Sequence, residues 1–209
     1  MVRKLYKKTR LVHGVGINDA DYATGTEVEG KAVRCPHYVV WKAMLRRCYD
    51  HKFQEHYPTY KGCSVCPEWI YFMNFRDWMM KQDWQGKALD KDLLTVGNKV
   101  YSPATCVFVD AMTNNFTNDR GRARGDYQLG VYFHKSVGKF QACCSNPFTK
   151  RREHLGVFNC EHQAHLAWKS RKHELANQLA DLQPDARVAD ALRTRYANSG
   201  EGRDCLGEF

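Results

Sequence analysis

The sequence predicts an α+β protein made of two modules. The first is helical and ends in a strand, a strand and a helix, and the second is a three-stranded antiparallel sheet plus one helix. Apolar residues recur at helical spacing up to about residue 80 and alternate as in strands after residue 127. The chain has 209 residues, 43% of them apolar, which is enough for two modest cores. We therefore expect an N-terminal basic arm (1–36), the first module (37–118), a linker (119–126), the second module (127–180), and a C-terminal helix with a flexible tail (181–209).

The charge distribution indicates a polyanionic partner. Residues 31–180 carry 23 lysines and arginines against 13 acidic residues, and this segment accounts for the net charge of +9. Such a balance suits nucleic acid, although a basic protein can also simply be a well-solvated one. The longest apolar run, residues 69–73, is too short for a signal peptide or a membrane span, and nine cysteines is an odd number for a disulfide framework. We expect a cytoplasmic protein that neither enters nor crosses a membrane.

The first module begins with two predicted amphipathic helices. The arm before it contains four glycines and at most a short strand over 4–12. Over 37–50, apolar and basic side chains occupy opposite faces of a helix. Pro67 at a first helical position opens the second helix. Its large apolar residues should lie in the core, namely Trp69, Phe72, Met73, Phe75, Trp78 and Met79.

The segment 89–115 carries the residues that indicate metal-dependent chemistry. We expect a strand at LDKDLL, a turn at 95–98, a strand at 106–109, and a helix that Asp110 caps. Asp90 offers a carboxylate at the first strand, and Asn114 offers an amide oxygen on the helix. Hard oxygen ligands of this kind suit a single Mg²⁺ or Mn²⁺ ion, which can stabilise charge on a phosphodiester during hydrolysis.

These residues resemble the ββα-metal core of the HNH endonucleases, particularly the variant in phage-encoded homing endonucleases. The resemblance rests on 89–92 (LDKD), 97–98 (GN), 101–103 (YSP), Cys106 and 114–115 (NN), with looser similarity at 47–49 (RCY) and 66–69 (CPEW). It implies that Asp90 and Asn114 bind the ion and that Asp90, Lys91 and Tyr101 form the catalytic group.

The chain departs from the commonest HNH pattern in ways that affect catalysis. No histidine lies between His56 and His134, so the usual general base is missing. The resembling variant is thought to use a tyrosine, which maps onto Tyr101. A tyrosine starts from a pKa of about 10 and would need a nearby cation to act as a base. Lys91 replaces the family's arginine and would stabilise charge without a bidentate fork.

The second module is predicted from alternation. Strands are expected at 129–135, 139–145 and 150–158, and Asn159 should cap a closing helix. Alternation places one set of side chains toward the helix: Val131, Phe133, Phe140, Ala142, Leu155 and Val157. The other set can then face DNA: Tyr132, His134, Lys139, Gln141 and Arg152.

The second module resembles the AP2 DNA-binding domain, in which a three-stranded sheet lies in the major groove. The resemblance rests on 130–132 (GVY), 138–142 (GKFQA), 154–158 (HLGVF) and the helix with Ala164 and Ala167. The family's run of strand arginines is thin here, because Tyr132 and His134 stand where arginine is common. The DNA target of that family therefore cannot be transferred to this chain. A small structural α+β module is the alternative.

Two further groups of residues have candidate roles. In the linker, Arg120, Arg122 and Arg124 are expected to contact DNA phosphates. Cys63 and Cys66 have the spacing of a zinc knuckle, and Cys35 and Cys48 are possible partners. A second C-x-x-C pair is absent from the sequence, so we favour the interpretation that these cysteines are small core residues.

Taken together, the residues predict a metal-dependent, homing-type DNA endonuclease of phage type that hydrolyses phosphodiester bonds in double-stranded DNA. The alternative is a catalytically inactive DNA-binding regulator built on the same two modules. A zinc-stabilised interaction protein is a third reading. The sequence shows no dimer interface.

Overall fold

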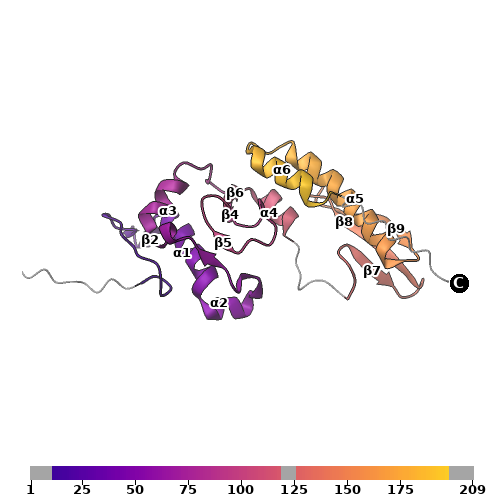
Figure 1. Cartoon of the computed structure of the whole chain (residues 1–209), viewed down its shortest axis with the longest axis horizontal. Coiled ribbons are helices and arrows are strands. Elements are labelled where there is room, and N and C mark those ends of the chain that lie inside the picture. Colours follow the sequence, from indigo (N-terminus) through magenta and orange to yellow (C-terminus); the bar gives the residue numbers. More distant parts are fainter. Residues whose placement is uncertain (1–10, 119–125, 198–209) are drawn as a thin grey trace, which may run out of the picture. The chain divides into compact units, whose positions relative to one another are not determined.

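A computed structural model describes residues 11–118 and 126–197 of the chain. Residue contacts divide it into two compact units, Met1–Asp110 and Ala111–Phe209, called unit 1 and unit 2 below. Both units contain helices and strands, so the predicted mixture of the two is confirmed (Figure 1). The expected strand at 4–12 lies mostly outside the described residues, as do the expected linker arginines and the end of the tail.

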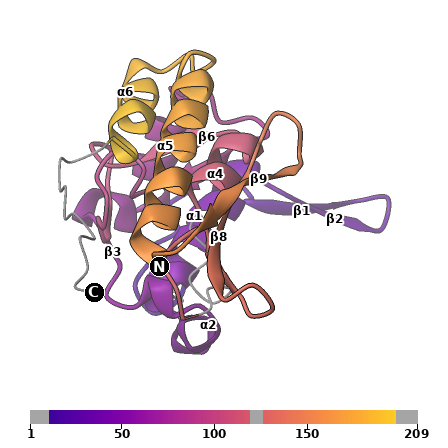
Figure 2. The ribbon, with the colours of Figure 1, turned by 90° about the vertical axis from the view of Figure 1, so that its right-hand side faces the viewer.

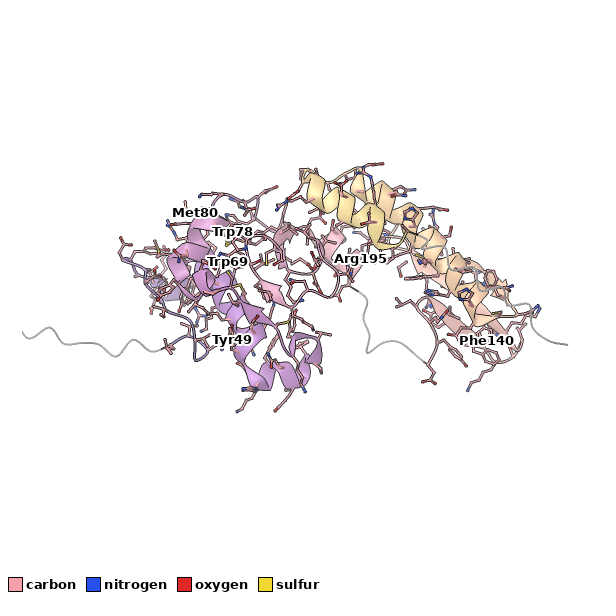
Figure 3. All side chains as sticks on the ribbon, viewed as in Figure 1. Tyr49, Trp69, Trp78, Met80, Phe140 and Arg195 are labelled. Atoms are coloured by element: carbon pink, nitrogen blue, oxygen red, sulfur yellow. The ribbon has the colours of Figure 1, made fainter. Side chains whose placement is uncertain are left out.

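The helices of unit 1 surround an aromatic core. They are α1 (Pro36–Tyr49), α2 (His51–His56), the 3-10 turns η1 (Pro58–Tyr60) and η2 (Pro67–Ile70), and α3 (Phe72–Met79). The Trp41 indole donates to the carbonyl of Trp69 at 2.7 Å, which ties α1 to η2. The rings of Trp69 and Trp78 lie 4.5 Å apart (Figure 3). Four of the six core residues predicted from Pro67 onward are fully buried, namely Trp69, Phe72, Phe75 and Met79, while Met73 and Trp78 are partly buried against them.

The single helix predicted from Pro67 is wrong, because the chain is extended at Tyr71 between η2 and α3. The reason is a backbone pairing with a distant segment. Ile17 donates to the carbonyl of Ile70 at 2.9 Å, and Phe72 donates to the carbonyl of Ile17 at 3.0 Å. This bridge takes backbone groups that a continuous helix would use internally.

Three pairs of short strands complete unit 1. β1 (Gly25–Val28) and β2 (Lys31–Arg34) form an antiparallel hairpin, drawn as a ribbon in Figure 2, that the sequence did not predict. Its turn places Glu29 and Gly30 in the left-handed region, with φ of 51° and 73°. β3 (Ser64–Val65) runs parallel to β5 (Val100–Tyr101), and β4 (Ala88–Asp90) runs antiparallel to β6 (Val107–Val109). The Tyr49 hydroxyl accepts a hydrogen bond from the backbone of Val65 at 3.1 Å (Figure 3).

Unit 2 contains the predicted three-stranded antiparallel sheet and closing helix. The sheet has the order β7 (Val131–His134), β8 (Lys139–Ser145) and β9 (Arg152–Phe158). α5 (Glu161–Ala180) packs on its strands and against α6 (Ala186–Arg195) (Figures 1 and 2). The predicted cap is wrong by one residue: Cys160 is the N-cap of α5, and its side chain makes no capping hydrogen bond.

The helix α4 (Ala111–Thr117) is held within unit 2 by side chains of α5 and α6. The Lys172 ammonium donates to the Phe116 carbonyl at 2.6 Å and lies 3.6 Å from the centre of its ring. Arg195 donates to the carbonyl of Thr117 at 3.3 Å. Two cations therefore stabilise the carboxyl end of α4, where the helix dipole is negative. The sequence had grouped this helix with the first module, whereas its contacts assign it to unit 2.

Among residues 11–118 and 126–197, we find no helix that combines the length and the apolar character needed to span a membrane.

Gly130 provides a test of how α5 packs on the sheet. Its φ is +78°, and a Cβ at this position would overlap the indole of Trp168. We expect Gly130→Ala to lower the free energy of unfolding by about 3 kcal/mol, since overpacking and left-handed strain act together. Gly138→Ala is the control, because Gly138 has a φ of +66° and open space around it. It should cost about 1 kcal/mol. Equal losses in urea unfolding followed by circular dichroism would contradict the close approach.

Candidate active site and nucleic-acid interface

Asp90 ends β4 and shapes the turn that follows it. One of its carboxylate oxygens accepts hydrogen bonds from the backbone of Asp92 at 2.9 Å and of Leu93 at 2.7 Å. Burial raises the pKa of the Asp90 carboxyl above its ordinary value, and the neighbouring negative charge of Asp92 raises it further. Asp90 is therefore a partly desolvated carboxylate with a second one beside it.

Lys91 is engaged within the same loop. Its side chain is 7% exposed, and the ammonium donates to the Asn98 carbonyl at 2.9 Å and pairs with Asp92 at 3.2 Å. Asn98 in turn donates to the carbonyls of Lys91 and Val100 at 2.7 and 2.8 Å. These bonds close the loop 91–98 and leave the ammonium positioning Asp92, whose side chain is 46% exposed. The Lys91 ammonium is therefore bound within the loop and does not project into solvent.

Tyr101 lies in the core of unit 1 with 1% of its surface exposed. Burial raises the pKa of its hydroxyl far above the ordinary value, and the charge of Arg47, which interacts with it, only partly opposes this shift. The nearby cation is thus Arg47 from α1 rather than the lysine that the sequence suggested. A buried phenol with a raised pKa is poorly suited to accept a proton at neutral pH.

Asn114 lies half-buried on α4, in unit 2, whereas Asp90 and Tyr101 lie in unit 1. Within unit 1 alone, the site residues that lie together are Asp90, Lys91 and Asp92. Asp92 belongs to the LDKD motif, although no role was predicted for it from the sequence. The signal for such a role was the pattern of two aspartates separated by one residue, Asp90 and Asp92.

The donor chemistry of the Asp90–Asp92 pair fits Mg²⁺ or Mn²⁺. A divalent cation would offset the negative charge that Asp92 places beside the Asp90 carboxylate, and Mg²⁺ commonly binds one or two carboxylates while keeping several waters. In the described part of the chain, no three side chains of His, Cys, Asp or Glu are placed to hold a metal ion. The Asp90–Asp92 pair therefore fits a site in which water molecules supply the remaining ligands of the ion.

The cysteines with the spacing of a zinc knuckle, Cys63 and Cys66, pack in the core of unit 1 together with Cys48. Cys48 and Cys63 are buried and Cys66 is half-buried beside them. Burial raises the pKa of each of these three thiols, to about 12 for Cys48. These three cysteines therefore pack as small core residues, the interpretation that the sequence favoured.

The sheet of unit 2 brings the five predicted DNA-facing residues of the strands together. Tyr132 pairs with Gln141, and His134 pairs with Lys139, so these four share one face. Arg152 pairs with Ser145, which places it on the same face by alternation. The opposite face is covered by α5 around Val131, Ala142 and Ala164. We call the face that carries Tyr132, His134, Lys139, Gln141 and Arg152 the outer face.

The expected position of Val157 is wrong. Val157 pairs with Gln141 and is 46% exposed, so it lies on the outer face instead of against the helix. The register shifts at Ala142 and Cys143, where Leu155 is left without a partner. One extra residue reverses which side chains face the helix on the two sides of the bulge.

The outer face is basic. Its strand positions carry Lys139, Arg152, His134 and His154, and no aspartate or glutamate within the three described strands. The single acidic strand residue, Glu153, lies on the helix side, where Arg171 binds it at 2.7 Å. The guanidinium of Arg152 lies over the Tyr132 ring, 4.1 Å from its centre.

Comparisons with protein families, with curated proteins and with solved structures found no match to this chain.

The raised pKa of Asp90 predicts how stability depends on pH. Its folded pKa lies above its unfolded value, so its contribution is fully present below the unfolded pKa and is lost as pH rises through the folded pKa. Asp90→Asn keeps the oxygen that caps the turn and removes the charge. We expect this variant to have a higher urea midpoint than the wild type at pH 7.5. The difference should vanish toward pH 4. A variant that is less stable at pH 7.5 would contradict the desolvation of Asp90.

Proposed function

We propose that this protein is a metal-dependent DNA endonuclease that binds double-stranded DNA through the outer face of β7, β8 and β9. The observation that carries the proposal is the sharing of one exposed, basic face by all five predicted strand residues. The resemblance to HNH endonucleases and AP2 domains supports the same conclusion.

Charge and shape support DNA as the partner of the outer face. Lysine and arginine on a surface without carboxylates attract the phosphate backbone. A sheet that is covered on one side by a helix can lay its other side in the major groove, as β-sheet readers do. Lys139 suits phosphate contact as a point charge, while Gln141 and Arg152 have the hydrogen-bonding groups that distinguish base edges.

The cleavage part of the proposal rests on the Asp90–Asp92 pair. The pair would hold Mg²⁺ or Mn²⁺, which supplies positive charge to phosphate oxygens and makes water more acidic. The chain's own residues keep that pair in place. Asp90 is fixed by two backbone donors, and Asp92 is held by the Lys91 ammonium. The burial of Tyr101 supports giving the proton-accepting role to a carboxylate, and Asp92 is the one that water reaches.

Two observations favour a second candidate, a DNA-binding regulator without nuclease activity. The phenol predicted to activate water lies in the core, and Lys91 is occupied within its loop. A chain that has kept its DNA-binding sheet and lost hydrolysis would look the same at the outer face. The two candidates differ only in what happens to bound DNA.

The DNA-binding part predicts a defined loss on removal of one outer-face cation. We expect Lys139→Ala to weaken binding to a duplex of random sequence several-fold and to reduce the slope of log affinity against log salt by about 1, because one phosphate contact is lost. Lys169→Ala is the matched control, since Lys169 lies on α5. Fluorescence anisotropy over a salt series measures both quantities. Equal effects of the two variants would place the DNA elsewhere.

The cleavage part predicts nicking that depends on the carboxylate pair. Wild-type protein should nick supercoiled plasmid in Mg²⁺ or Mn²⁺, and Asp90→Asn and Asp92→Asn should each lower the rate by at least about 100-fold, since each removes half of the anionic pair. Their affinity for DNA should match that of the wild type. Intact DNA in every divalent ion, with wild-type binding preserved, would eliminate the nuclease and leave the regulator.

A further inference from the structure

We propose that Arg152 and Tyr132 act as one recognition unit that reads a single guanine in the major groove. This inference rests on the proposed binding of double-stranded DNA by the outer face. Arg152 comes from β9 and Tyr132 from β7, and the two side chains meet across the central strand β8. The guanidinium lies 4.1 Å from the centre of the ring, and both residues are exposed.

The ring removes the main obstacle to arginine as a base reader. A free arginine side chain has many rotamers, and fixing its plane opposes binding. Contact with an aromatic face holds the guanidinium while leaving N–H groups available at its rim. Arg152 has no ion pair in the part of the chain that the structure describes, so no carboxylate occupies those donors.

Guanine is the base that fits this arrangement. In the major groove it presents two acceptors, O6 and N7, at the spacing of the guanidinium fork. Adenine replaces one acceptor with a donor, which a guanidinium cannot satisfy. Within the three strands, Arg152 is the sole arginine on the outer face, so one guanine is the expected reading. Tyr132 is a positioning residue, because it acts through Arg152.

The experiment begins with wild-type protein and a duplex library with a randomised core. Selection should recover an invariant guanine. Replacing that guanine by 7-deazaguanine, which lacks the N7 acceptor, should weaken wild-type binding about 10-fold in fluorescence anisotropy. Arg152→Ala should abolish this discrimination, because no donor then reaches the O6 and N7 acceptors. Arg151→Ala is the matched control, since exposed Arg151 directly precedes β9 and its loss removes the same charge while leaving the discrimination at the wild-type value.

The role of Tyr132 is tested by its own variant. Tyr132→Leu should lower the 7-deazaguanine discrimination about threefold, and discrimination equal to that of the wild type would overturn the pairing. Retention of guanine preference in Arg152→Ala would overturn the recognition unit while leaving the proposed function intact. Failure of the wild type to bind any duplex would overturn the proposed function itself.

Discussion

The pairing register of β8 with β9 decides what unit 2 presents to its surroundings. One face of the sheet is buried against α5, so alternation sends every second side chain outward. Glu153 shows how tightly this is specified, since it must lie on the helix side to reach Arg171 at 2.7 Å. A slip by one residue would place this carboxylate on the outer face and turn Arg152 toward the helix. The basic character of the outer face thus follows from the packing of its opposite side.

In unit 1 the corresponding constraint is the closure of the loop after β4. The Asp90 carboxylate has two roles: one of its oxygens accepts the hydrogen bonds that fix the turn, and the same group is proposed to bind a cation. Lys91 and Asn98 exchange hydrogen bonds across the loop and keep it short. The site is therefore built on bonds that exist before any ligand arrives, as preorganisation requires. The same bonds explain why Lys91 does not project into solvent.

The sequence predicted those parts of the fold where a strong period coincides with burial. The three strands of unit 2 and α5 alternate or repeat clearly, and their positions were predicted within a few residues. The hairpin β1–β2 was not predicted because its described side chains are all exposed. No buried face imposes an alternation of apolar and polar residues on these strands. Val157 was placed on the wrong face because a bulge is invisible to a simple period of two. The break at Tyr71 depends on Ile17, which lies more than fifty residues away.

The candidate site shows the same limit in its chemistry. Residue identity suggested Tyr101 as a base, yet the role of a tyrosine depends on its solvation, which only the fold determines. At 1% exposure, its phenolate would lose most of its hydration, and Arg47 compensates for only part of that loss. Burial also raises the pKa of Asp90, but for a carboxylate this change favours proton acceptance. A carboxylate whose pKa is raised by burial accepts a proton more strongly than an unperturbed one, and Asp92, the neighbour of Asp90, is the carboxylate that water reaches. Any hydrolytic chemistry in unit 1 is therefore better assigned to its aspartates than to its tyrosine.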